Sequence, residues 1–312
     1  MKDRFSFPLY SWMIEQFKGD LPCTDDYEGL KQKAREMFLL QAFLLLRKTG
    51  QRRPPFDPFA TGEQRRIHRI TWVDSGDEAS LVPDLEGFHL ILRRPENISS
   101  EAELLKDVRV RSTVAHEVGH TFFFDISHFP PKQGPRFEHA LASNVREKEE
   151  WWCFDFARKL LLPDRWIKKS VISHNFSGLE LASKIRREYN VSWDILLRKL
   201  VYDLEMWATS TVFRLDFEDS QVILRNEYKD IWKGARTRIG RARPWLLENA
   251  DFINGCVGRI ENARNKSTEE IVARFVNPSE KYVAEFLPIY RDRPTLLCLV
   301  RESDGILDKY LT

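Results

Sequence analysis

The feature that most constrains this chain is a pair of histidines four residues apart, His116 and His120, with Glu117 directly after the first. On a helix, positions i and i+4 lie on one face about one turn apart, so both imidazoles can reach a single ion. Glu117 lies one step round the helix, where its carboxylate can contact a water bound to that ion. The neighbouring residues are largely apolar: Val114, Ala115, Val118 and the run 122–124. They predict a buried helix, which suits a metal site better than an exposed surface.

A third ligand is expected from a second helix, because a catalytic zinc site takes three protein ligands and keeps one position open. Residues 146–162 have helical periodicity, and an apolar stripe follows both Glu149 and Glu150. The stripe from Glu150 contains Cys153, Phe154, Ala157, Leu160 and Leu161. A glutamate that begins such a stripe points inward, so we prefer Glu150 as the ligand, with Glu149 as the alternative.

Together these residues predict a zinc metalloendopeptidase that binds one catalytic Zn²⁺ through His116, His120 and Glu150. The bound ion would make a water acidic near neutral pH, and Glu117 would be the general base that later passes the proton to the leaving amine.

Three further residues are candidates for supporting roles. His128 and His139 flank a loop rich in proline and glycine, residues 129–135, and either could donate a hydrogen bond to an oxyanion. Asp125 could orient a ligand imidazole. The alternative for each histidine is an ordinary loop residue.

Two segments make the pattern resemble a known family. The first segment, residues 109–121, contains the HExxH motif, and the second, residues 150–163, has the pattern E-x-x-C-x-x-F-A-x-x-L-L-x-P. Together they resemble the ImmA/IrrE family of zinc metallopeptidases. Residues 181–200 look like the helix-turn-helix-like tail that often follows this family's core. The resemblance covers about residues 65–205. It departs from the family at Trp152 and Phe154, where a charged and a small polar residue are usual, and these bulky side chains could narrow the cleft.

The resemblance implies a protein substrate, namely a helix-turn-helix transcriptional repressor whose cleavage would switch on a stress, DNA-damage or mobile-element response. Two alternatives stay open. One is a toxin or phage-defence protease with another protein substrate. The other is a non-proteolytic, zinc-containing regulator that binds DNA or protein, although a structural zinc site has no use for a general base such as Glu117.

The expected fold class is α+β. A helical N-terminal segment (1–60) packs on a mostly helical, zincin-like core (61–210) that includes the tail at about 178–207. A strand-rich C-terminal domain (211–312) would act as a sensor or recognition module, GAF-like as in some relatives. In the core, residues 67–73 and 88–92 are the expected strands, and 88–92 is the expected edge that could hold an extended substrate.

Composition limits the partners and the compartment. The 49 lysines and arginines nearly cancel the 47 acidic residues, so nucleic acid is not expected as the principal partner. The basic run Arg225–Arg243 leaves a weaker possibility of direct binding. The four cysteines are widely separated and form no CxxC pair, and the N-terminus does not resemble a secretory signal, so we expect a cytoplasmic protein. The longest apolar stretch has ten residues, which is too short to span a membrane.

Overall fold

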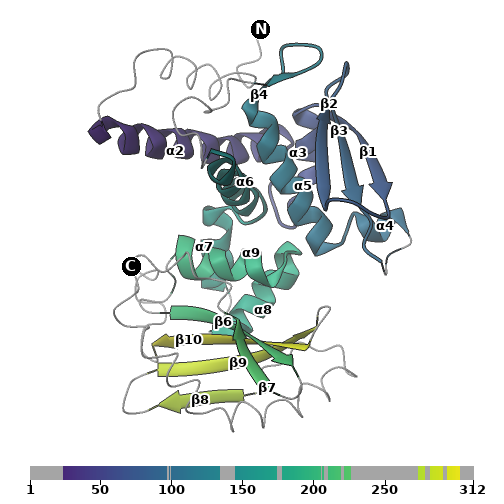
Figure 1. The fold of residues 1–312 in the computed structure, drawn as a ribbon. Coiled ribbons are helices and arrows are strands. Elements are labelled where there is room, and N and C mark those ends of the chain that lie inside the picture. Colours follow the sequence, from purple (N-terminus) through teal and green to yellow (C-terminus); the bar gives the residue numbers. More distant parts are fainter. Residues whose placement is uncertain are drawn as a thin grey trace. The chain divides into compact units, whose positions relative to one another are not determined.

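The structure is a computed structural model of the 312-residue chain. It describes residues 24–96, 98, 100–133, 145–173, 178–204, 206, 210–218, 221–225, 273–277, 282–290 and 294–302 (Figure 1). The chain divides into two compact units, the first within residues 1–166 and 188–192, the second within residues 167–187 and 193–312. The boundary expected near residue 210 falls inside the second unit.

The first unit combines helices with small sheets, which agrees with the expected α+β class. Its elements are α2 (Thr24–Lys48), α3 (Pro58–Gln64), β1 (Ile67–Val73), β2 (Ala79–Pro83), β3 (Phe88–Arg93), α4 (Glu101–Leu104), α5 (Val108–His120), a 3₁₀ turn η1 (Thr121–Phe123), β4 (Phe124–Asp125), β5 (Lys132–Gln133) and α6 (Val145–Leu161).

The three-stranded sheet of this unit has the order β1–β3–β2. β3 pairs with β1 in parallel and with β2 antiparallel, so it is the central strand. The expectation that residues 88–92 form an edge was therefore wrong. Alternate residues Phe88, Leu90 and Leu92 are buried, so one face of β3 packs in the core. The edge beside α5 is β2, which the sequence pattern did not predict (Figure 1).

Helix α5, which carries both histidines, is fixed at its two ends. It does not continue from α4, because the carboxylate of Asp107 accepts from the backbone N–H groups of Arg109 and Val110 at 2.9 Å and starts a new helix. At the other end the buried guanidinium of Arg65 donates to the hydroxyl of Thr121 at 3.0 Å and to its carbonyl at 2.9 Å. The same carbonyl also accepts from the backbone N–H of Phe124, which closes the 3₁₀ turn η1.

An aromatic cluster joins α2, η1 and α6 in the core of the first unit. The fully buried ring of Phe38 lies at its centre. Its centroid lies 5.2–6.1 Å from the rings of Phe122, Phe123, Trp152 and Phe156. These are favourable separations for aromatic pairs, so the cluster fixes α6 against the segment that follows α5. The half-buried Trp152 thus packs against this cluster.

The second unit contains helices followed by a sheet of five antiparallel strands in the order β7–β6–β10–β9–β8. Its elements are the rest of α7 (Asp164–Ser173), most of α8 (Gly178–Tyr189), α9 (Trp193–Arg198), the π-helical turn η3 (Lys199–Asp203), β6 (Ser210–Glu218), β7 (Gln221–Arg225), β8 (Ala273–Asn277), β9 (Tyr282–Tyr290) and β10 (Pro294–Glu302). The basic run beyond Arg225 lies outside the described residues.

A buried carboxylate connects α8 to this sheet. Glu285 of β9 is fully buried, and its side chain accepts from the backbone N–H of Leu179 at 2.8 Å, in the first turn of α8. A Cβ on Gly178 would lie 1.7 Å from the same carboxylate, and Gly178 has a φ of +59°. Glycine therefore allows the carboxylate to occupy the N-terminus of the helix, where negative charge is stabilising.

Among the described helices, none has the length and apolar character that crossing a bilayer requires.

We expect Phe38→Ala to lower the free energy of unfolding by about 3–5 kcal/mol, because it removes the central ring of a closed cluster. Phe43→Ala is the matched control, since the same residue type in α2 is 53% exposed there. It should change stability by less than about 1 kcal/mol. Urea denaturation followed by circular dichroism measures both, and equal losses would contradict the role given to the cluster.

Candidate metal centre

Helices α5 and α6 approach each other closely at one glycine. A Cβ on Gly119 would lie 3.1 Å from Cα of Cys153 and 3.2 Å from its Sγ atom. Cys153 is itself fully buried. A side chain at this position would displace α6, so glycine is required here. The close approach brings the first described turns of α6 alongside His116 and His120.

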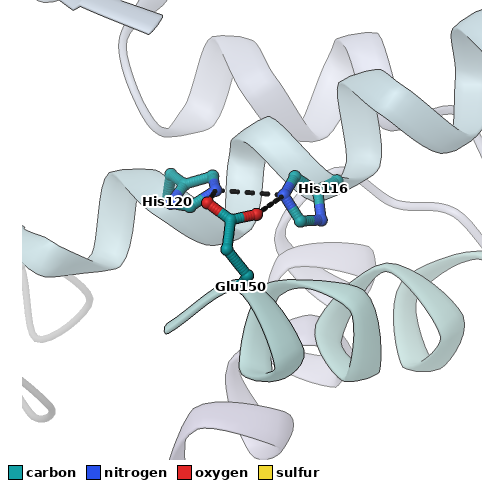
Figure 2. Close-up of side chains that lie close together, drawn as sticks. All are labelled: His116, His120 and Glu150. Carbon is teal, nitrogen blue, oxygen red and sulfur yellow. Dashed lines mark hydrogen bonds and ion pairs between the residues drawn. The ribbon is translucent and has the colours of Figure 1, made fainter. Parts of the chain in front are cut away.

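Three side chains converge on one point between the helices (Figure 2). His116 Nε2 lies 3.0 Å from Glu150 Oε2, and His120 Nε2 lies 3.5 Å from Glu150 Oε1. The two Nε2 atoms are 3.0 Å apart. The three residues therefore form a group that could hold a metal ion, with one donor atom from each lying within 4.8 Å of the others.

The geometry of this group fits a small divalent cation. Tetrahedral zinc with bonds of 2.0–2.2 Å places its ligand atoms about 3.4 Å apart, close to the separations observed. Two imidazole nitrogens and a carboxylate are the donor types that such a site uses. Hydrogen bonds from His116 and His120 hold the pKa of Glu150 well below its usual range.

Glu149 contacts the opposite side of one ligand imidazole. Its Oε1 atom lies 2.9 Å from His120 Nδ1, the ring nitrogen that faces away from the group. A carboxylate in this position fixes the tautomer and orientation of a metal-binding histidine. Of the two glutamates left open by the sequence, Glu150 thus converges with the histidines and Glu149 lies behind His120. The corresponding Nδ1 of His116 is buried and has no hydrogen-bond partner among the described residues.

Glu117 lies next to His116 on α5 and outside the converging group. Burial raises the pKa of its carboxyl group, and attraction to His120 and His116 offsets this only in part. A pKa raised toward neutrality is the direction that a general base requires. Cys153 offers no such chemistry, since burial raises the pKa of its thiol to about 12. Cys153 is therefore a small residue of the core.

Two of the predicted supporting residues follow α5: Asp125 lies in β4, and His128 lies in the turn after it. Asp125 accepts from the backbone N–H of Ser127 at 2.9 Å and from its hydroxyl at 2.6 Å, and it lies 3.3 Å from His128 Nε2. Asp125 and His128 therefore contact each other, and the carboxylate that contacts a ligand imidazole is Glu149. His139 lies outside the described residues. An oxyanion role for either histidine stays a prediction.

The sequence pattern did not single out Glu78, which contacts the helix face that bears Glu117. Its carboxylate accepts from Arg109 Nε at 2.7 Å and from the hydroxyl of Thr113 at 3.1 Å. Arg109, Thr113 and Glu117 follow at intervals of four residues along one face of α5. Glu78 immediately precedes β2, so these contacts hold the start of the edge strand against α5. The helical spacing was readable in the sequence, but nothing in it identified the partner.

We expect Glu150→Ala to abolish stoichiometric zinc binding, because it removes a donor from the group. Glu149→Ala should keep zinc but bind it about 10–100-fold more weakly, the usual effect of losing a carboxylate behind a ligand histidine. Competition with a chromophoric chelator measures both affinities. Full zinc content in Glu150→Ala together with loss in Glu149→Ala would reverse the two assignments.

Gly119→Val should destabilise the protein by about 1–3 kcal/mol through overpacking and weaken zinc binding as α6 moves away. Ser112→Val controls for the low helix propensity of valine within the same helix. Thermal unfolding of the metal-free proteins and zinc titration are the measurements. Unchanged zinc affinity in Gly119→Val would show that the close approach does not set the ligand geometry.

Comparisons with known proteins place this chain in no family. No family model matches it, and neither does any curated protein. Among solved structures, one described as a Mycobacterium tuberculosis transcriptional regulator is similar at a TM-score of 0.46 and 10% identity, over 87% of this chain and 90% of that chain. A likeness at this level assigns neither a family nor an activity.

Proposed function

We propose that this chain is a zinc-dependent endopeptidase. The observation that carries the proposal is the convergence of His116, His120 and Glu150, with Glu117 adjacent on the same helix. A structural zinc site has four protein ligands, whereas three protein ligands and a nearby carboxylate base are typical of hydrolytic sites. Among the described residues, the group has three members.

Each residue has a defined part in the proposed reaction. His116, His120 and Glu150 would hold the ion, and Glu149 would orient His120. A zinc ion bound there supplies a Lewis acid that polarises the peptide carbonyl and lowers the pKa of a water. The carboxylate of Glu117 takes a proton from the attacking water and delivers it to the nitrogen of the leaving amine.

The edge strand supports a protein substrate. β2 lies beside α5 and pairs on one side only, with β3, among the described residues. An extended peptide can add to such an edge through main-chain hydrogen bonds, because the edge presents unpaired N–H and C=O groups. Such a peptide would run along the α5 face that carries Glu117. The sequence resemblance points to a helix-turn-helix repressor as the natural substrate, cleaved to release a stress, DNA-damage or mobile-element response.

The experiment compares the zinc-loaded protein with its Glu117→Gln variant on a peptide library made by digesting a bacterial proteome. Mass spectrometry identifies new termini. We expect the wild-type protein to generate them and Glu117→Gln to reduce cleavage at least about 10³-fold while keeping one zinc per chain, because the amide cannot accept the proton.

Chelation with EDTA should abolish cleavage and re-addition of zinc should restore it. A Glu117→Gln protein that binds zinc and still performs the cellular function would favour the non-proteolytic regulator instead. Cleavage that survives both chelation and this substitution would contradict the assigned site.

A further inference from the structure

One aromatic side chain beside the metal group has no part in the roles assigned above. Phe154 lies on α6 one turn after Glu150, so the two side chains share a face of the helix. Its ring centroid lies 4.3 Å from that of His116, with the planes tilted by 48°. The ring therefore contacts the imidazole whose Nε2 atom faces the metal group.

Phe154 differs from the other aromatic residues of α6 that surround it. Phe156 is fully buried and Trp152 packs on Phe38, whereas Phe154 is 52% exposed. A single exposed phenylalanine is ordinary on a protein surface, so exposure alone means little. What distinguishes this ring is that one part contacts a candidate ligand while the rest is open to solvent. Trp151, on the same helix and 59% exposed, enlarges the apolar surface beside Glu150.

We infer that Phe154 determines substrate specificity by contacting a large apolar side chain next to the cleaved bond. This rests on the proposed endopeptidase function. To react, the substrate carbonyl must approach the point where His116, His120 and Glu150 converge. An extended peptide advances only about 3.3 Å per residue, so the side chains bordering that carbonyl lie within reach of a ring in contact with His116.

Because the Phe154 ring is apolar, it should favour apolar side chains of the substrate. Phe154 neither donates nor accepts a proton, and it leaves apolar surface exposed when no substrate is bound. A leucine, methionine or aromatic side chain would bury that surface, whereas a charged side chain would lose hydration without gaining a partner. The expected substrate class is therefore a peptide or unfolded segment with a large apolar residue on one side of the cleaved bond.

The test uses the same peptide library with zinc-loaded wild-type, Phe154→Ala and Phe43→Ala proteins. Phe43 is the matched control, a phenylalanine of α2 with 53% exposure. In the wild type, one position next to the cleaved bond should be enriched in large apolar residues. Phe154→Ala should reduce the kcat/KM preference for such a residue over alanine by about 10-fold, the usual effect of removing apolar contacts from a binding site.

Two readouts separate specificity from a merely structural role. Phe154→Ala should keep one zinc per chain, and Phe154→Leu should restore the apolar preference. In the Glu117→Gln background, fluorescence anisotropy should show that the best-cleaved peptide binds about 10-fold more weakly once Phe154 is replaced by alanine.

The outcomes distinguish the two proposals. Cleavage by the wild type with an unchanged preference in Phe154→Ala overturns the inference and leaves the endopeptidase standing. A uniform loss for all peptides also overturns it, because that is the signature of a structural residue. No cleavage by the zinc-loaded wild type overturns both.

Discussion

The contact between Gly119 and Cys153 is the constraint on which the rest of the first unit depends. Functional side chains must be held within about 0.5 Å of a productive geometry, and helices with ordinary side chains at their crossing do not approach so closely. Other interactions then limit how α5 and α6 can move. Asp107 and Arg65 fix the two ends of α5, and the cluster around Phe38 holds α6. The metal group is thus a consequence of packing that begins well outside it.

Much of the site could be predicted from the sequence because its residues are placed by the regular spacing of helices. Histidines at i and i+4 must share a helical face, and their apolar neighbours indicate which way that face is turned. The choice between Glu149 and Glu150 was harder, since consecutive residues of an amphipathic helix can both border its apolar stripe. The structure shows that both carboxylates contact the histidines, one on each side of the His120 ring. Helical periodicity indicated that a glutamate of this helix points inward. Which of the two glutamates contacts which side of His120 depends on how α6 packs on α5.

The fold was less predictable where elements are short or join distant segments. Residues 79–83 form an edge strand that is half-exposed and ends in a proline, so they lack the alternation by which strands are recognised. The order of strands in the sheet depends on tertiary packing, which is why the central position of β3 was mistaken for an edge. The break before α5 did have a signal in the sequence, the capping residue Asp107. An aspartate is recognised as a helix cap only when it is known that the preceding helix has ended.

The carboxylate of Glu285 at the start of α8 has a consequence for biosynthesis. Leu179 and Glu285 are separated by 106 residues in the chain. At typical rates of translation, about 5–20 s pass between the synthesis of the helix and the synthesis of its partner. The two histidines and the glutamate of the metal group have all been made by residue 150, and the first unit ends at residue 192. On the ribosome, the residues of this group are therefore complete several seconds before the second unit can be.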